Sequence, residues 1–252
     1  MRIFTLAIII VLAGCASPAQ KAADSAPVVT DSGSVQAYVA EGDVLQWYDI
    51  PFAKPPVGDL RWRAPEPLDA KSQLISRRAE PAICPQLAGS VSGVEGDAAI
   101  GAEDCLYLDV TAPASGTEPL PVMVWIHGGG NTTGHKNTYD FSRFVAQQKV
   151  IVVTINYRLG PLGWFAHPTL GNGPGTIANF GTLDIIAALG WVKRNIGAFG
   201  GDADNVTIFG ESAGGHNVFT LLASPLSEGL FHKAISQSGY CLLYTSPSPR
   251  DP

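Results

Sequence analysis

The chain has 252 residues, of which 46% are hydrophobic and 15% are charged, a balance typical of a globular protein with ample material for a core. The formal net charge of -6 argues against a surface built to bind nucleic-acid phosphates. We therefore expect a folded protein with no nucleic-acid partner.

The first residues, MRIFTLAIIIVLAGC, have the pattern of an export signal, because one positive charge precedes an apolar run too short to cross a bilayer. The run Leu12-Ala13-Gly14-Cys15 resembles a bacterial lipobox. We expect residues 1–14 to be removed and Cys15 to carry a lipid anchor in the cell envelope. Ala16 favours the outer membrane or a periplasm-facing position. An ordinary secretory signal with a chance cysteine, giving a secreted protein, is the alternative.

Small, polar and proline-bearing residues fill the segment 15–34, which predicts a flexible tether that does not fold. At the other end, residues 241–252, CLLYTSPSPRDP, resemble the translation of a sequencing-library adapter. We expect this tail to be non-native and exclude it from fold reasoning, with a genuine Pro/Ser-rich tail as the alternative. A partial domain is therefore expected over residues 35–240.

Two cysteines remain between these ends, Cys84 and Cys105. An exported chain meets an oxidising compartment, which favours a disulfide between them. Two free buried thiols are the alternative.

The middle of the chain alternates between strand and helix patterns. Proline-rich residues 35–83 suit short strands that cover a larger core. Apolar runs at 121–127 and 149–158 predict buried strands, and further strands are expected at 206–209 and 233–237. Helices are expected over 139–148, 179–195 and 213–223, from apolar residues at helical spacing and from the order of the elements. This order predicts an α/β fold with a mostly parallel central sheet and flanking helices.

The stretch GESAGG follows one of these strands and opens a helix. A serine hydroxyl attacks a carbonyl well only when a sharp turn presents it to a base, and Gly210 and Gly214 give that turn the room it needs. The G-x-S-x-G pattern in this setting predicts that Ser212 is a nucleophile. The alternative is that Ser212 only caps the helix.

A second glycine-rich stretch, WIHGGG, ends at Gly130. Consecutive glycines let backbone amides turn toward the negative oxygen that forms when an acyl carbonyl becomes tetrahedral. We predict an oxyanion hole formed by the amides of Gly129, Gly130 and Ala213. A tight glycine turn without a ligand is the alternative.

These blocks, with PFAKPPVGDLRWRAPEPL, EDCLYLDV, VVTINYRLGPLGWF and GLFHKAISQSG, resemble the N-terminal half of a type-B carboxylesterase, in the cholinesterase-like branch of the α/β-hydrolases. The resemblance runs from about residue 49 to 239. It implies an α/β-hydrolase fold, here truncated after the nucleophile elbow, and serine ester hydrolysis through an acyl-enzyme intermediate. No metal or organic cofactor is implied.

The resemblance also assigns individual residues. It supports the pairing of Cys84 with Cys105, and it implies two buried ion pairs, Arg61 with Glu103 and Arg158 with Asp184. Asp184 is therefore not expected to be the catalytic acid. Glu211 is expected to tune the site electrostatically, and His127 to lie near the glycines in a structural role. The family pattern usually has an aromatic residue where this chain has Asn131.

A reactive serine needs a histidine base and a carboxylate that orients it. After Ser212 only His216 and His232 occur; the first is expected one helical turn behind Ser212 and the second on the surface before a strand. The family places its acid and histidine further downstream, so we expect this chain to be a fragment without turnover.

Two other functions are compatible with these residues. One is a cholinesterase-like binding or adhesion protein that has lost the chemistry, although intact GESAGG and HGGG argue against it. The other is amide or peptide hydrolysis by the same groups. The expected partner is a small-molecule carboxylic ester of unspecified acyl and alcohol parts, and the residues carry no signal of oligomeric state.

Overall fold

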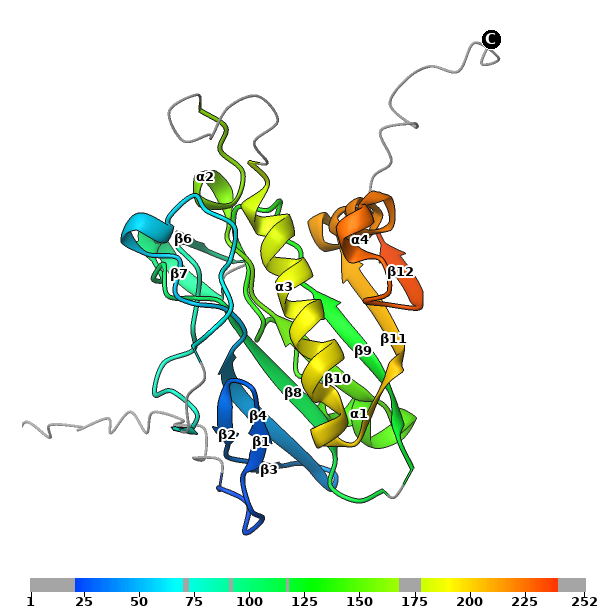
Figure 1. Ribbon diagram of the computed structural model, residues 1–252. Helices are drawn as coiled ribbons and strands as arrows, with labels where there is room; N and C mark the ends of the chain where they lie inside the picture. The colour runs from blue at the N-terminus through cyan, green and yellow to red at the C-terminus, as the bar shows by residue number, and fades with distance from the viewer. Residues whose placement is uncertain (1–20, 70–72, 91–92, 117, 168–177, 240–252) are drawn as a thin grey trace, which may run out of the picture.

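The computed structural model describes residues 21–69, 73–90, 93–116, 118–167 and 178–239 (Figure 1). Its strands are β1 (Val28–Thr30), β2 (Gly33–Val35), β3 (Tyr38–Ala40), β4 (Val44–Pro51), β5 (Leu74–Ile75), β6 (Gln86–Gly89), β7 (Val94–Ile100), β8 (Tyr107–Pro113), β9 (Leu120–Ile126), β10 (Ile151–Ile155), β11 (Gly201–Glu211) and β12 (Lys233–Gln237). Its α-helices are α1 (Ser142–Gln148), α2 (Gly160–Gly163), α3 (Phe180–Asn195) and α4 (Ala213–Ala223), and short 3-10 turns lie at Gly58–Leu60, Ile196–Phe199 and Pro225–Ser227.

The central sheet has seven strands in the order β12-β11-β9-β10-β8-β4-β3. Strands β12, β11, β9 and β10 pair in parallel, whereas β8 pairs antiparallel with both β10 and β4. Because β4 is antiparallel to β8, it points the same way as the four parallel strands, so only β8 and β3 run in the opposite direction. The expected α/β sheet with mostly parallel strands is confirmed.

Helices cover both faces of this sheet. Alternate residues of β9, β10 and β11 (Val124, Val153 and Ile208) join the large core cluster that contains α3 and α4. The intervening residues Trp125 and Val152 join a smaller cluster with Val145 of α1, on the opposite face. Strands that are apolar on both faces form because both faces are covered. Figure 1 shows α3 lying along one face of the sheet and α4 beside it.

The predicted elements around the nucleophile agree closely with the structure. The helix predicted over 213–223 is α4 and the strand predicted over 233–237 is β12, with the same bounds. The helix predicted over 139–148 begins later, at Ser142, because Asp140 accepts hydrogen bonds from the Ser142 amide (2.9 Å) and hydroxyl (2.6 Å). Tyr139 and Phe141 instead pack against the Trp125 ring.

The tether predicted over 15–34 is wrong for its described part, residues 21–34. Val28–Thr30 forms β1, which pairs antiparallel with β2, and β2 pairs with β5. Asp31 connects this small sheet to α3, because its amide donates to Asn195 (2.9 Å) and its carboxylate accepts from Arg194 (2.7 Å). A turn around Asp31 and two preceding valines outweigh the polar composition of the segment.

Three predictions concern residues outside the described part of the chain: the export signal at 1–14, the lipid at Cys15 and the tail at 241–252. Within the described ranges, no helix combines the length and apolar character that a membrane crossing requires.

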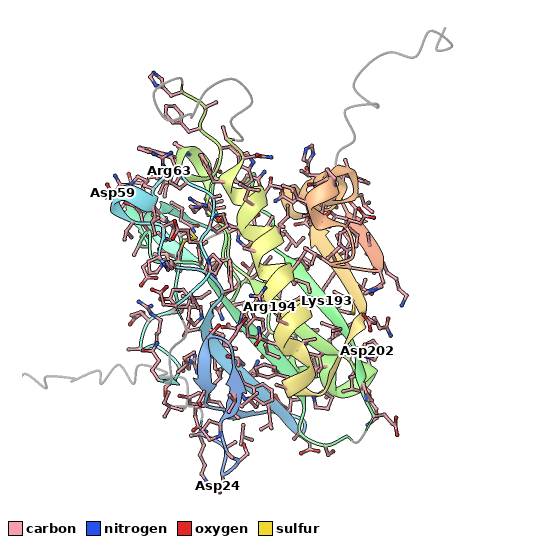
Figure 2. The ribbon with its side chains drawn as sticks, in the orientation of Figure 1. Asp24, Asp59, Arg63, Lys193, Arg194 and Asp202 are labelled. Atoms are coloured by element: carbon pink, nitrogen blue, oxygen red, sulfur yellow. A yellow bond between two sulfur atoms is a disulfide. The ribbon has the colours of Figure 1, made fainter. Side chains whose placement is uncertain are left out.

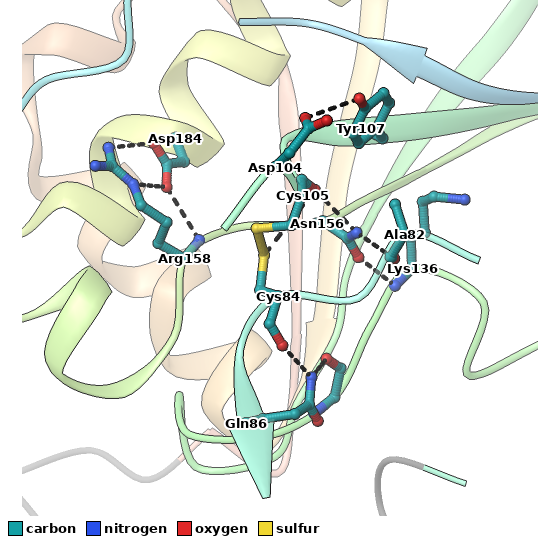
Figure 3. Close-up of a disulfide and its surroundings, with 11 residues drawn as sticks. Ala82, Cys84, Gln86, Asp104, Cys105, Tyr107, Lys136, Asn156, Arg158 and Asp184 are labelled. Carbon is teal, nitrogen blue, oxygen red and sulfur yellow. Dashed lines mark hydrogen bonds and ion pairs between the residues drawn. A yellow bond between two sulfur atoms is a disulfide. The ribbon is translucent and has the colours of Figure 1, made fainter. Parts of the chain in front are cut away.

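The Cys84–Cys105 disulfide is present, with the two sulfur atoms bonded and both residues buried (Figure 3). It connects the segment before β6 to the segment before β8. The two positions are 21 residues apart in sequence, and a cross-link that closes such a loop stabilises the fold mainly by restricting the unfolded chain.

We expect the double variant Cys84→Ser/Cys105→Ser to lose about 3 kcal/mol of unfolding free energy. Urea unfolding of the two proteins measures the difference, and adding reductant should weaken the parent chain alone. Equal midpoints for the parent and the variant would show that the bond contributes nothing to stability.

Candidate active site

Ser212 lies at the sharp turn between β11 and α4. Its backbone has φ 58° and ψ -121°, a conformation that a residue with a side chain rarely adopts. Its side chain makes no capping hydrogen bond to α4, so the interpretation of Ser212 as a simple helix cap is wrong. The turn is held by hydrogen bonds from the Ser212 amide to the Gln237 carbonyl (2.8 Å) and from the His216 amide to the Ser212 carbonyl (3.0 Å).

The glycines on either side of Ser212 are required by close backbone packing. A Cβ atom added to Gly214 would lie 2.0 Å from the Ile126 carbonyl oxygen, and one added to Gly210 would lie 2.6 Å from Gly214. Ile126 is the last residue of β9, directly before the HGGG stretch. The turn therefore packs directly against the start of that stretch.

Residues 128–134, which we call the glycine loop, lie beside the serine. A Cβ atom added to Gly128 would lie 3.1 Å from the Ser212 Cβ and 2.7 Å from the Glu211 carbonyl oxygen. Gly128 and Ser212, which are 84 residues apart in sequence, are thus in van der Waals contact, as nucleophilic chemistry on this fold requires.

Gly129 and Gly130 adopt backbone conformations that favour glycine, with φ 99° and 63°. The Gly129 carbonyl points into the loop, where it accepts hydrogen bonds from the amides of Thr132 (3.1 Å) and Thr133 (3.0 Å). Ala213 is the first residue of α4, so its amide belongs to the helix end whose N–H groups lack partners within the helix. A helix N-terminus of this kind favours negative charge.

His127 is buried immediately before the glycine loop. Its Nδ1 donates to the Gly128 carbonyl (2.8 Å), and its ring stacks on Tyr157 with the centroids 4.3 Å apart. Tyr157 in turn donates its hydroxyl to the His127 carbonyl (2.6 Å). Burial lowers the pKa of His127 to about 4, so the ring is neutral at physiological pH. These contacts agree with the structural role predicted for it.

The lowered pKa of His127 predicts a pH-dependent stability. The unfolded chain binds a proton at this ring near pH 6.5, whereas the folded chain binds it only near pH 4. Between these values the unfolded state holds more protons, so the contribution of His127 to stability is complete above pH 6.5 and is lost as pH falls toward 4.

We expect this loss to approach about 3 kcal/mol, measured by urea unfolding across the same pH window. In a His127→Gln variant, the slope of the unfolding free energy against pH should be smaller by the equivalent of one proton. Parallel slopes for the two proteins would contradict the assignment of this proton to His127.

The other predicted site residues take the following places. Glu211 is the last residue of β11, with its carboxylate facing Gly128. His216 is four residues after Ser212 on α4, one turn behind it as expected. His232 is exposed directly before β12, where its Nδ1 accepts from the Val206 amide (3.1 Å).

The two predicted ion pairs differ in burial. Arg158 and Asp184 are both buried and joined by paired hydrogen bonds of 2.8 and 2.7 Å, as expected (Figure 3). Arg61 and Glu103 are joined at 2.6 Å, but their side chains are 40% and 24% exposed, so the prediction that this pair is buried is wrong. Arg61 follows a short 3-10 turn in the proline-rich covering segment, which lies at the surface.

Gln86 supports the glycine loop, a role that no local sequence pattern indicates. Its side-chain oxygen accepts from the Gly134 amide (2.8 Å) and the Thr133 hydroxyl (2.6 Å), and its amide nitrogen donates to the Gly134 carbonyl (2.8 Å). Its position two residues after Cys84 is the only hint that the chain offers. The disulfide therefore fixes the segment that carries this support.

A pocket of about 290 Å³ opens between the glycine loop and the β6–β7 hairpin. Thr132 and Thr133 line one side, and the residues from Leu87 to Ser90 line the other. A metal site formed by three or more His, Cys, Asp or Glu side chains is not found among the residues that the structure describes.

Most of the chain is similar to known proteins. The model of the Carboxylesterase family matches residues 25–250. The chain belongs to the carboxylesterase family. It is 49% identical over 214 residues to a para-nitrobenzyl esterase of Bacillus subtilis (strain 168), covering 84% of this chain and 43% of that protein. It is 47% identical over 215 residues to a fumonisin B1 esterase of Sphingopyxis macrogoltabida, covering 83% and 39%.

Solved carboxylesterase structures share the fold. A thermophilic PNB esterase superposes with a TM-score of 0.77 at 46% identity, covering 85% of this chain and 44% of that chain. A Geobacillus stearothermophilus carboxylesterase superposes with a TM-score of 0.74 at 40% identity, covering 84% and 44%. The chain thus spans less than half the length of these relatives.

Asn131 occupies the position where the carboxylesterase pattern usually has an aromatic residue. It has φ 57°, and its side-chain oxygen accepts from Asn217 (2.9 Å) and lies 3.4 Å from the Tyr157 hydroxyl oxygen. Its backbone carbonyl accepts from the Gly160 amide (2.7 Å). The amide side chain therefore connects the glycine loop to α4 and to the segment after β10, which gives this side of the site a polar wall.

Proposed function

We propose that this protein is the N-terminal portion of a serine carboxylic ester hydrolase that acts on small molecules through an acyl-enzyme intermediate. The observation that carries the proposal is the contact between the strained Ser212 turn and the glycine loop. Family membership supports the reaction class, because the relatives named above are esterases.

In the proposed reaction, the Ser212 hydroxyl attacks the ester carbonyl and gives its proton to a histidine base. The carbonyl oxygen becomes negative and accepts hydrogen bonds from the amides of Gly129, Gly130 and Ala213, each worth about 2.7–4 kcal/mol of the barrier. The alcohol leaves with the proton from the histidine, and water then releases the acid from Ser212. Glu211 adds negative charge beside the site. These steps require no metal or organic cofactor.

We infer that the histidine and its carboxylate come from residues beyond this chain. Three observations support the inference. The chain covers only 43% of the para-nitrobenzyl esterase. Asp184 forms an ion pair with Arg158, and His127 is neutral and hydrogen-bonded to the Gly128 carbonyl. We also propose that the protein is exported and held in the cell envelope by a lipid at Cys15, on the sequence pattern of residues 1–15 alone.

A serine-directed fluorophosphonate probe tests this function. It is applied to the product of the uninterrupted reading frame, by which we mean the longer protein that also contains the proposed histidine and carboxylate. Labelling of the parent protein that is absent in Ser212→Ala supports the enzyme. A folded parent protein that takes up no probe would instead indicate a binding protein with this fold. The 252-residue chain is expected to show no ester turnover. Turnover that depends on Ser212 in the purified 252-residue chain would contradict the inference that the histidine base comes from residues beyond it.

A further inference from the structure

A buried lysine lies just beyond the glycine loop, and the proposed reaction does not use it. The Lys136 side chain is 1% exposed. Its ammonium donates to both Asp109 oxygens (2.6 Å each) and to Asn137 (3.1 Å), and it lies 3.0 Å from Asp49 Oδ1. An ammonium group has three donors, and these partners satisfy them. We call Lys136, Asp49, Asp109 and Asn137 the Lys136 cluster.

The two carboxylates of the cluster are held by the antiparallel part of the sheet. Asp109 belongs to β8, and Asp49 belongs to β4 where the pairing with β8 is irregular. Asp49 has φ 55°, and its amide donates to Asp109 (2.7 Å) while its Oδ2 accepts from the Arg78 amide (3.0 Å). A strained backbone of this kind persists only where its surroundings fix it.

The same lysine is fixed through its backbone. The Lys136 amide donates to the Asn156 side-chain oxygen (2.8 Å), and the Asn156 amide nitrogen donates to the Ala82 (2.8 Å) and Cys105 (3.0 Å) carbonyls, as Figure 3 shows. Two residues earlier, Gly134 is held by Gln86 on both its amide and its carbonyl. The C-terminal end of the glycine loop is thus attached to β8, β4 and the residue after β10.

The N-terminal end of the glycine loop follows β9 and is fixed by that strand. The C-terminal end is fixed by the Lys136 cluster. We propose that Lys136 is a positioning residue that holds the amides of Gly129 and Gly130 in the geometry needed to bind the oxyanion. The inference rests on the proposed esterase function, and it adds a residue that contacts neither substrate nor Ser212. A small displacement of such donors is costly, since a shift of about 1 Å can reduce a rate about a hundredfold.

The kinetic test compares Lys136→Met with the parent in the product of the uninterrupted reading frame. The variant keeps the aliphatic stem and loses the ammonium. We expect the rate constant for fluorophosphonate labelling of Ser212, and kcat for a small ester, to fall about tenfold to a hundredfold with little change in KM. Partial unfolding would instead lower the labelled fraction and leave the rate constant of the folded protein unchanged.

Lys193→Met is the matched control. Lys193 is in the last turn of α3 and pairs with Asp204 at 2.7 Å, but its side chain is 38% exposed (Figure 2). This control should keep the parent rate constant. Asp49→Asn is a milder second variant, because asparagine tolerates a positive φ and retains an acceptor oxygen; it should show a smaller fall in the same direction. Parent rate constants in folded Lys136→Met and Asp49→Asn would overturn the proposal.

Hydrogen exchange gives a readout that does not depend on catalysis. Peptides that cover residues 128–134 should exchange faster in Lys136→Met than in the parent, whereas Lys193→Met should leave them unchanged. Unchanged exchange in a folded Lys136→Met protein would overturn the positioning role even if Ser212 is reactive. Faster exchange with no labelling of the parent at Ser212 would overturn the esterase function and the catalytic purpose of the cluster.

Discussion

Ser212→Ala is expected to lower kcat for ester hydrolysis by about a millionfold in the product of the uninterrupted reading frame, the order seen when a serine hydrolase loses its nucleophile. The reason is that the acyl-enzyme cannot form without this hydroxyl. The turn itself should survive, because it is held by backbone hydrogen bonds from Ser212 and His216 rather than by the side chain. Stopped-flow and long-time hydrolysis of a chromogenic ester measure the change.

Ser224→Ala is a suitable control for this experiment. Ser224 directly follows the last residue of α4, its side chain caps nothing, and it lies twelve residues beyond Ser212 in the sequence. We expect the control to keep the parent kcat. Activity retained in Ser212→Ala after repurification would show that another group performs the chemistry, and the assignment of the nucleophile would be wrong.

Arg158→Met is expected to destabilise the fold by about 3–5 kcal/mol, the cost of leaving one buried charge without its partner. Asp184 is fully buried and accepts from the Arg158 amide (3.0 Å) as well as from the guanidinium. Burial already raises the pKa of Asp184 while Arg158 lowers it, so removing Arg158 raises that pKa further. Urea unfolding near neutral pH measures the loss.

The half-exposed pair of Arg61 and Glu103 provides the matched comparison. Arg61→Met should cost much less unfolding free energy than Arg158→Met, because solvent screens the exposed pair. Equal losses in the two variants would show that burial does not decide the contribution of these ion pairs. A small loss in Arg61→Met would agree with the position of Arg61 at the surface.

Local patterns sufficed for the strand, turn and helix around Ser212. The apolar run before Gly210 and the apolar spacing after Ala213 are properties of neighbouring residues. The elements α4 and β12 have the predicted bounds, whereas β11 begins at Gly201, five residues before the apolar run at 206–209. The disulfide could be predicted because only two cysteines remained once Cys15 and Cys241 were set aside.

Contacts between distant residues could not be predicted in the same way. Lys136, Asp49 and Asp109 come from three separate segments, and no periodicity in any one of them indicates that they meet. The strand at Val28–Thr30 was missed because its stability comes from pairing with β2 and from contacts with α3, whereas the segment 15–34 around it has the composition of a linker. The exposure of Arg61 likewise depends on how the covering segment lies over the core.

The Ser212 turn and the glycine loop are packed without space between them, which restricts the substitutions that either can accept. A single methyl group at Gly214 or Gly128 would collide with main-chain oxygen atoms, so the reacting geometry has no room for gradual adjustment. The hairpin residues from Leu87 to Ser90, which face the loop across an open pocket, have no such restriction. Replacements in that hairpin therefore change the lining of the pocket without disturbing the Ser212 turn, whereas replacements at Gly214 or Gly128 displace the turn itself.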